Sequence, residues 1–328
     1  MNFKQAELMG VFSVLPTGTI DTYYLDKFSN NYFTAGESIV LDELITELSS
    51  LSIVPRGTKA KEIRINGTAR KTITPDIIAG KSSLTTNELL QIQAGQVETI
   101  INGKVVDNFQ VVKDRHLTKL KNGLTATQTR MSAELFLTGK VTLPESADVI
   151  DYGFNKVEEV KKNKGEIDWT LFIMDLVEKY KAKNKVYPTN IEVDSSIFKE
   201  MLNDENFREQ VKAFGMAGAV ANNKYPTLNI LNYQISVLPH AEDAQGKAID
   251  TDKLIVLSNN SEFVKGYVGL SYAENNQLKL FSGEYLVDEV TEKDPATQYF
   301  TLMSGFVPVI PMPQRIQRYK LTLEEKKK

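Results

Sequence analysis

A long amphipathic segment dominates the hydrophobic pattern of the chain between residues 107 and 139. Its core-facing positions recur at steps of three, four and seven residues, which is the period of one face of an α-helix. These positions are Phe109, Val112, His116, Leu120, Leu124, Met131 and Leu135. Asp107 or Asn108 can cap the start and Gly139 supplies a stop, so we expect one helix about 45 Å long. Gly123 and the threonine-rich turn after it predict a local bend.

Alternating apolar and charged positions between residues 39 and 90 predict β-structure. Asn66-Gly67 separates two alternating runs, and this dipeptide is a strong signal for a tight hairpin turn. The cationic side chains of that hairpin are Lys59, Lys61, Arg64, Arg70 and Lys71. Because a two-stranded ribbon is only marginally stable alone in water, we expect the hairpin to lie against another surface.

Residues 1–38 read as an arm rather than a domain, because Pro16-Thr17-Gly18 interrupts their short apolar pieces. A group of aromatic side chains follows this interruption: Tyr23, Tyr24, Phe28, Tyr32 and Phe33. Five aromatic residues so close together need an apolar surface to cover them. Two surfaces remain open at this point, the chain's own domain and a neighbouring subunit.

Residues 166–287 combine helical and strand-like patterns. Three amphipathic stretches each follow an acidic residue of the kind that caps a helix N-terminus. The three caps are Asp168, Asp194 and Asp204. Short apolar strands are expected at residues 190–193, 233–238, 254–258 and 266–270. We therefore expect this part of the chain to form a compact α/β unit.

The flanking segments are richer in strands. Residues 91–165 hold a small hairpin around Asn102-Gly103 before the long helix, and a strand pair after it. Residues 288–328 return to strands, and Pro308 confines the middle of this region to a sheet edge or an irregular position. The chain as a whole therefore predicts an α+β fold.

Composition narrows the class of protein. The chain has 328 residues, of which 41 % are hydrophobic, and this supports a real core. Its net charge of −3 offers no basic field to hold nucleic acid tightly, although a weak, non-specific contact stays open. With no cysteine and only two histidines, disulfides and a multi-histidine metal site are excluded. We find no membrane-length apolar run and no secretory signal, so we expect a cytoplasmic protein without a membrane partner.

Patterns that carry catalysis are missing from the sequence. We find no phosphate-binding loop, dinucleotide fingerprint, nucleophile elbow, zinc-protease motif or calcium loop, so we predict no catalytic residue, cofactor or metal. His240 and Asp204 are the candidates for a site in residues 166–287, and they keep an α/β enzyme as the alternative from another class. His116 lies on the helix stripe and reads as a core or interface histidine. An arm, a charged hairpin and a long helix without catalytic groups favour assembly.

The order of these elements is similar to that of a known family. The match rests on three stretches: residues 33–75, which end in Ile73-Thr74-Pro75; the helix from Asn108 into Leu137-Thr138-Gly139-Lys140-Val141; and residues 294–303, followed by Phe306-Val307-Pro308. None of these motifs is chemically specific, and their order and spacing carry the likeness. On that basis the chain resembles the lambda-type capsid protein E family of tailed-bacteriophage major capsid proteins.

The resemblance implies the tailed-phage major capsid fold. Its parts would be an N-terminal arm (1–38), an extended β-hairpin loop (39–90), a peripheral domain (91–165) with the spine helix 107–139, an α/β axial domain (166–287), and a return to the peripheral domain with a C-terminal tail (288–328). The arm and the loop would then contact a neighbouring subunit. The implied contact residues are Tyr23, Tyr24, Phe28, Tyr32, Phe33, Lys59, Lys61, Arg64, Arg70 and Lys71.

The resemblance also implies a function. The chain would be a structural subunit that self-assembles into hexamers and pentamers of an icosahedral virion capsid around double-stranded DNA, put together in the host cytoplasm. Its partners would be other copies, a separate scaffold protein, a portal and, as the lambda-type means of strengthening the shell, a decoration protein. DNA would be contacted non-specifically. A nanocompartment shell of the same fold is the alternative, and a lysine–asparagine crosslink is not expected, because no acceptor asparagine is identified.

Overall fold

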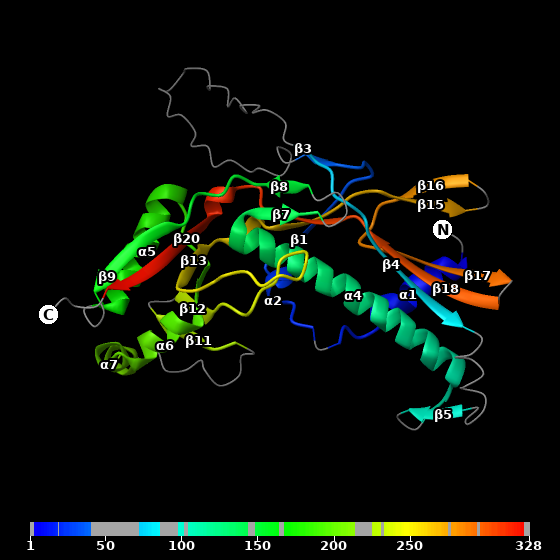
Figure 1. The fold of residues 1–328 in the computed structure, drawn as a ribbon, viewed down its shortest axis with the longest axis horizontal. Coiled ribbons are helices and arrows are strands. Elements are labelled where there is room, and N and C mark those ends of the chain that lie inside the picture. Colours follow the sequence, from blue (N-terminus) through cyan, green and yellow to red (C-terminus); the bar gives the residue numbers. More distant parts are fainter. Residues whose placement is uncertain are drawn as a thin grey trace, which may run out of the picture.

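The computed structural model describes residues 3–18, 20–40, 72–85, 98–101, 104–143, 148–163, 167–213, 225–230, 233–274, 277–293 and 296–324. Its organising element is helix α4 (Asn108–Thr138), which runs diagonally through the molecule (Figure 1). This confirms the predicted long helix. The predicted stripe is buried at Leu120, Leu124, Met131 and Leu135, and half-buried at Val112 and His116. The side chain of Phe109 lies outside the described residues.

The threonine-rich part of α4 stays helical through Gly123. The hydroxyl groups of Thr125, Thr127 and Thr129 donate hydrogen bonds to the carbonyl oxygens four residues earlier, at 3.0, 3.0 and 2.8 Å. Such bonds satisfy the hydroxyls within the helix itself. The helix therefore continues as one element at this point, and the bend stays a prediction.

One end of the molecule is a six-stranded sheet covered by helices (Figure 1). In spatial order its strands are β11 (Thr227–Ile230), β12 (Tyr233–Val237), β10 (Asn190–Val193), β13 (Leu254–Ser258), β20 (Ile316–Glu324) and β9 (Glu158–Asn163). Its helices are α5 (Trp169–Asn184), α6 (Ser195–Asn203) and α7 (Glu205–Ala213). Asp168, Asp194 and Asp204 cap them as predicted, because each carboxylate accepts a hydrogen bond from a first-turn N–H.

The six-stranded sheet has different limits from the predicted unit 166–287. Strand β20 pairs antiparallel with β13 and parallel with β9, so a strand from the C-terminal region completes this sheet. The strands between residues 264 and 287 belong to other sheets. The shared core includes Ile191, Ile235, Leu257 and Tyr319 from the strands, and Phe172, Leu176 and Tyr180 from α5. Local patterns identified the strands, but pairing between distant strands determined the boundary.

The other end of α4 packs against a three-stranded antiparallel sheet. Its strands are β17 (Leu286–Lys293), β18 (Ala296–Ser304) and β4 (Ile78–Thr85). Helix α1 (Phe3–Val14) joins α4 in a core with this sheet. Residues 1–38 were expected to form an arm of short apolar pieces, and α1 was not predicted, although Leu8, Val11, Phe12 and Leu15 recur at the spacing of one helix face. Leu8 and Phe12, one turn apart, are buried in this core at 5 % and 0 % exposed.

A third core lies between the two ends of the molecule. It includes the sheet formed by β1 (Asn30–Phe33), β14 (Val264–Tyr267) and β19 (Phe306–Val309), in which β19 is an edge strand. The edge position predicted for Pro308 is confirmed. Four strand pairs complete the described fold: β2 (Ile39–Val40) with β3 (Thr72–Ile73), β5 (Glu98–Ile101) with β6 (Lys104–Asp107), β7 (Lys140–Thr142) with β8 (Val149–Asp151), and β15 (Leu270–Glu274) with β16 (Gln277–Phe281).

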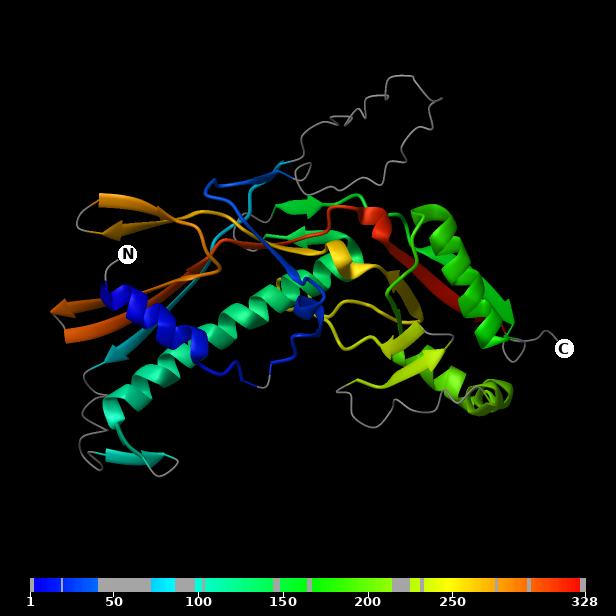
Figure 2. The same cartoon turned by 180° about the vertical axis from the view of Figure 1, so that it is seen from behind.

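The N-terminal segment runs along α4 from α1 to the short helix α2 (Tyr23–Asp26) (Figure 2). Lys121 of α4 donates to the carbonyl oxygens of Phe12, Ser13 and Leu15, at 3.0, 2.9 and 2.5 Å. A cation placed there satisfies the free carbonyls at the C-terminal end of α1. The N–H of Gly18 then bonds to a side chain of α4. The predicted arm therefore packs on its own chain over this stretch.

Three tyrosine hydroxyls lie in buried positions. Tyr24 donates to the carbonyl oxygen of Pro239 at 2.8 Å, and Tyr152 donates to that of Pro308 at 2.7 Å. Burial raises the pKa of both hydroxyls well above the ordinary tyrosine value of about 10. Burial also raises the pKa of Tyr319 to about 12. All three side chains are therefore neutral in the folded chain at neutral pH.

We expect the free energy of unfolding to fall as the pH rises above about 10. The stabilisation is complete below the unfolded pKa and is lost above it, because the unfolded chain then releases protons that the folded chain retains. Each tyrosine contributes a slope of up to about 1.4 kcal/mol per pH unit. Urea unfolding between about pH 8 and 11 measures this slope. In the Tyr152→Phe variant this slope should be smaller by up to about 1.4 kcal/mol per pH unit, because one tyrosine no longer titrates. A free energy of unfolding that does not change between these pH values contradicts the expectation.

Candidate assembly surfaces

The structure divides the five aromatic residues of the predicted contact. Tyr24 and Phe28 are 2 % and 0 % exposed in the central core, and Tyr23 and Tyr32 are half-buried against it. For these four, the chain's own domain supplies the apolar surface. Fully buried rings leave nothing for a neighbouring subunit, so the predicted contact at Tyr24 and Phe28 is corrected to a core role. Phe33 is 44 % exposed and stacks on Tyr267 with ring centres 5.2 Å apart.

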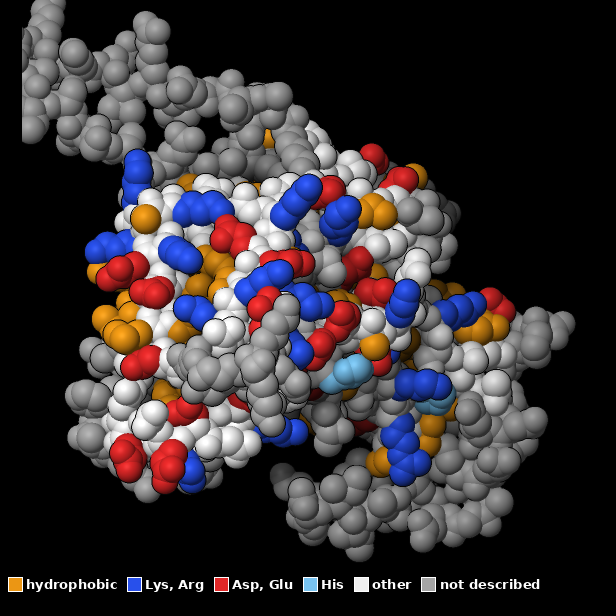
Figure 3. All heavy atoms as spheres, turned by 60° about the vertical axis from the view of Figure 1, so that its left-hand side comes forward, with side chains coloured by type: hydrophobic (Ala, Val, Ile, Leu, Met, Phe, Trp, Pro, Cys, Tyr) orange, Lys and Arg blue, Asp and Glu red, His pale blue; other side chains and the backbone are white. Residues whose placement is uncertain are grey.

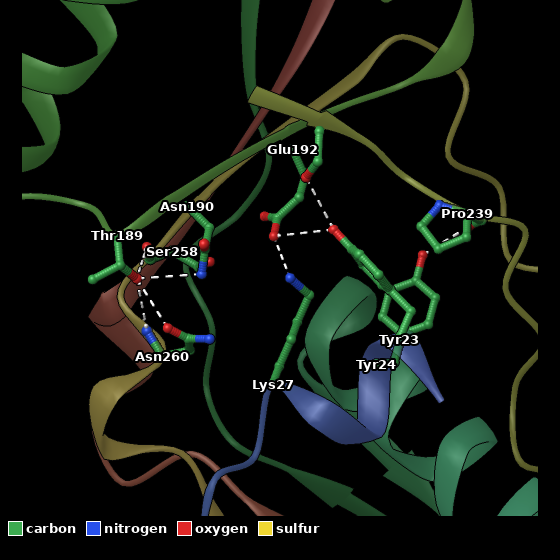
Figure 4. Close-up of polar contacts among 10 residues, drawn as sticks. Tyr23, Tyr24, Lys27, Thr189, Asn190, Glu192, Pro239, Ser258 and Asn260 are labelled. Atoms are coloured by element: carbon green, nitrogen blue, oxygen red, sulfur yellow. Dashed lines mark hydrogen bonds and ion pairs between the residues drawn. The ribbon is translucent and has the colours of Figure 1, made fainter. Parts of the chain in front are cut away.

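A buried ion pair fastens the N-terminal segment to the six-stranded sheet (Figure 4). Lys27 follows α2 and pairs with Glu192 of β10, and their side chains are 8 % and 0 % exposed. The Tyr23 hydroxyl lies 3.1 Å from the Ser236 hydroxyl of β12 and donates to Glu192 Oε1 at 3.4 Å. Lys27 Nζ also lies 4.4 Å from the Tyr23 ring centre and 4.9 Å from that of Phe136 on α4. Groups from four separate elements therefore meet around one lysine.

In this buried cluster the charges of Lys27 and Glu192 compensate each other. Burial, reinforced by the Glu192 carboxylate, raises the pKa of Tyr23 well above its ordinary value, so its hydroxyl stays a donor. Glu192 Oε2 has no hydrogen-bond partner among the described residues. The carboxylate thus relies on Lys27 and Tyr23 for its compensation. Sequence reasoning missed this cluster, although an acidic residue inside the short apolar strand 190–193 was a visible signal.

The β2–β3 pair joins the described residues on either side of residues 41–71. Ile39 pairs with Ile73, and Val40 pairs with Thr72. Ile39 and Ile73 are 0 % and 3 % exposed, so the two ends of the segment are held together in the central core. The predicted hairpin residues Lys59, Lys61, Arg64, Arg70 and Lys71 lie outside the described residues, and their contact with a neighbouring subunit stays a prediction.

Two leucines on the β15–β16 pair form an exposed apolar surface that the sequence did not single out. Leu278 is 84 % exposed and Leu280 is 71 % exposed. They alternate with a lysine in the short strand β16. The signal was present in the sequence, since Asn275-Asn276 separates two strand-like runs. An alternating pattern does not reveal which face of a hairpin its own domain covers.

The residues considered for an enzyme site lie in separate settings. Asp204 caps α7 by accepting the Phe207 N–H at 2.7 Å. His240 is exposed in the loop after β12. His116 is half-buried on α4, with Nδ1 2.7 Å from the Ser82 hydroxyl, which agrees with its predicted position on the core stripe. Within the described ranges, no three acidic or histidine side chains are placed to hold a metal ion.

Charges of both signs share the surface at the α5–α7 end of the molecule. Figure 3 shows acidic and basic side chains interspersed over this face. A mixed surface gives no single-sign field of the kind that binds nucleic acid strongly. Of the helices that the structure describes, none is long and apolar enough to cross a membrane.

Comparison with known proteins assigns this arrangement to a family. The profile of the family described as phage major capsid protein E matches residues 4–314. A prophage protein of Escherichia coli CFT073 described as a capsid protein has a similar structure, with a TM-score of 0.59 and 14 % identity, over 97 % of this chain and 99 % of that chain. A phage-related protein of Bordetella bronchiseptica RB50 gives a TM-score of 0.53 and 11 % identity, over 96 % of each chain. No curated protein sequence matches the chain.

The two kinds of comparison agree. Similarity to the solved structures at such low identity establishes the fold, and it confirms the predicted tailed-phage capsid fold with its α+β composition. The family profile extends from α1 to the turn before β20, so it includes α4 and most strands of all three cores. The chain therefore belongs to the phage major capsid protein E family.

Proposed function

We propose that the chain assembles into the hexamers and pentamers of an icosahedral shell that encloses double-stranded DNA. The observation that carries this proposal is the family match over residues 4–314. Rotation from one copy to the next through unlike contact surfaces produces closed rings, and rings of five and six can close a shell. Family and fold give the chain a structural role, and we propose no catalytic activity for it.

The same proposal assigns roles to the parts of the subunit. Residues 39–90 hold the loop that reaches over a neighbouring subunit, and α4 is the spine of the peripheral domain. The sheet topology supports a revised axial domain at the centre of each capsomer. It comprises residues 158–258 and 316–324, because β20 joins the six-stranded sheet whereas residues 264–293 belong elsewhere.

The proposed partners are those that a capsid needs for its assembly and for the packaging of DNA. A separate scaffold protein and a portal take part in assembly in the host cytoplasm, and a decoration protein strengthens the finished shell. Packaged DNA contacts the inner surface non-specifically. The net charge of −3 supports a weak contact rather than tight binding. Of the contact residues implied by the resemblance, Tyr23, Tyr32, Phe33 and the five cations between residues 59 and 71 keep their proposed role.

Sedimentation velocity of the purified chain tests the capsomer proposal. Raising the protein concentration should shift the chain from single subunits toward species of five and six copies, because mass action favours association at higher concentration. Class averages of the larger species should show five- and six-fold rings. A chain that stays monomeric or dimeric at every concentration, with and without a scaffold, contradicts the proposal.

A nanocompartment shell of the same fold is the runner-up, and the family match favours the phage shell. The contents of the particles distinguish the two. Phage particles isolated from the producing cells should protect double-stranded DNA from nuclease. Particles that instead hold a protein cargo and no protected DNA favour the nanocompartment.

Replacing His240 with alanine should leave assembly unchanged. His240 is exposed in the loop after β12, and an exposed surface substitution away from a contact changes stability by less than about 0.5 kcal/mol. Particle yield by sedimentation and stability by urea unfolding measure both effects against the unchanged chain. A wild-type turnover that His240→Ala abolishes would revive the enzyme alternative.

A further inference from the structure

The β15–β16 hairpin carries an apolar face that the described part of its own chain leaves uncovered. Directly opposed residues of an antiparallel pair point to the same side of the ribbon. Leu278 lies opposite Ala273, and Leu280 lies opposite Ser271. Both leucines therefore share one face with two small residues, and they project beyond them.

The opposite face of the hairpin has a different character. Leu270 lies opposite Phe281 on that side, and Leu270 is completely buried. Its burial shows that the root of the hairpin packs against the rest of the chain. The next pair on this face is Tyr272 and Lys279, which is amphipathic rather than aliphatic. The two exposed leucines are thus confined to the face that the root contacts do not use.

The hairpin is held beside the end of strand β1. The N–H of Gly269 donates to the carbonyl oxygen of Gly36 at 2.9 Å, and the Ser282 hydroxyl donates to that of Thr34 at 3.3 Å. Ser282 continues the alternation of Leu278 and Leu280 along the chain, so the leucine face leads toward residues 33–34. Phe33, with 44 % exposure, lies at this point. The hairpin is therefore continuous with Phe33, the exposed aromatic residue that is proposed to contact a neighbouring subunit.

We propose that the face formed by Leu278 and Leu280 is a contact surface for a second copy of this chain. The inference rests on the proposed shell function and extends it to a surface that nothing above assigns. A two-stranded ribbon with both outer edges unpaired, as these strands are within the described residues, gains stability when something packs on it. In the proposed shell every subunit is surrounded by other copies, so a second copy is the occupant that the shell function supplies.

The size of the face indicates when the contact forms. A stable two-protein interface takes roughly 800 Å² from each partner, and two leucines supply only part of that area. The hairpin therefore does not dimerise free subunits. The leucine contact forms only when the other contacts within a capsomer or between adjacent capsomers also form. Free subunits should therefore expose the two leucines, and particles should bury them.

Single-cysteine labelling tests this inference directly, since the chain has no cysteine of its own. Leu278→Cys and Leu280→Cys place a thiol on the proposed contact face, and Lys279→Cys places one on the other face of the same strand. Each variant is labelled with a maleimide as free subunits and as assembled particles. Because thiol reactivity follows exposure, we expect the first two to react about tenfold more slowly in particles, and the third to change less than about twofold.

The possible outcomes distinguish a failure of the proposed hairpin contact from a failure of particle assembly. Wild-type particles in the same preparation establish that assembly occurs, so equal labelling of all three positions in particles overturns the hairpin contact alone. Protection that develops only after a second protein is added assigns the face to that protein and also overturns the proposal. Protection at positions 278 and 280 in particles of this chain alone supports it. Urea unfolding of each free variant confirms that the subunit is folded before labelling.

Discussion

Replacement of residues 41–71 by an Asn-Gly turn is expected to abolish particles while leaving a folded, soluble subunit. Val40 and Thr72 are opposed residues of an antiparallel pair, and a two-residue turn joins such a pair without distortion. Ile39 and Ile73 stay buried in the central core, so the subunit keeps the contacts on both sides of the excision. The proposed contacts from Lys59, Lys61, Arg64, Arg70 and Lys71 to a neighbouring subunit are removed.

Two measurements decide this prediction. Electron microscopy scores particles, and urea unfolding scores the subunit, whose free energy of unfolding should not decrease because a shorter loop costs less closure entropy. The matched control replaces the five cations of the segment by serine and keeps its length. If the control also fails to assemble, the charges carry the contact. An unfolded excision variant would show that residues 41–71 belong to the core of their own subunit, and abundant particles would refute the contact.

Replacing Lys27 by methionine should lower the free energy of unfolding by about 3–5 kcal/mol. The change leaves Glu192, which is 0 % exposed, as an unpaired charge in the interior. Methionine keeps an apolar side chain of similar length but removes the ammonium group, which pairs with Glu192 and lies over the Tyr23 and Phe136 rings, so the loss reports mainly on the charge. A loss of this size is a large fraction of the stability of an ordinary domain. Urea unfolding of the purified subunit measures it.

A double variant separates the charge from the packing. Lys27→Met combined with Glu192→Gln removes both charges, and it should recover at least half of the lost stability, because the remaining amide is less costly to bury than a carboxylate. The third arm of the cycle is Glu192→Gln alone. A Lys27→Met subunit within about 1 kcal/mol of the wild type contradicts the account of the α2 contact, since a stranded buried charge costs more than that.

Local signals in the sequence were sufficient wherever one element determines its own structure. The stripe from Leu120 to Leu135 predicted α4, and the acidic caps at Asp168, Asp194 and Asp204 predicted where three helices begin. A 3.6-residue period and a cap are properties of a few consecutive residues. The hairpin before α4 and the strand pair after it were predicted for the same reason.

Features that depend on contacts between distant residues were not predictable in this way. Strand β20 pairs with β13 and β9, and no local pattern in residues 316–324 reveals those partners. Helix α1 has a short apolar stripe, but its place in the fold depends on contacts with α4, including those of Lys121. The arm aromatics could be covered by their own domain or by a neighbour, and only the fold separates Phe28, in the core, from Phe33, at the surface.

The candidate contact surfaces show the same limit. The sequence directed attention to the aromatic and cationic residues, which are conspicuous by type. Leu278 and Leu280 are ordinary strand residues, and their importance comes from an exposure that is visible only when the fold leaves them uncovered. The Lys27–Glu192 pair likewise joins residues that are far apart in the chain, and neither residue indicates its partner.

Negative-stain electron microscopy of the purified chain, with and without a co-expressed scaffold protein, tests the central claim most directly. The claim is that this member of the phage major capsid protein E family builds a shell from copies of itself. We expect closed particles, tubes or six-membered rings in at least one preparation. A monodisperse monomer or dimer in both preparations would contradict the claim and direct attention back to residues 166–287 as an enzyme.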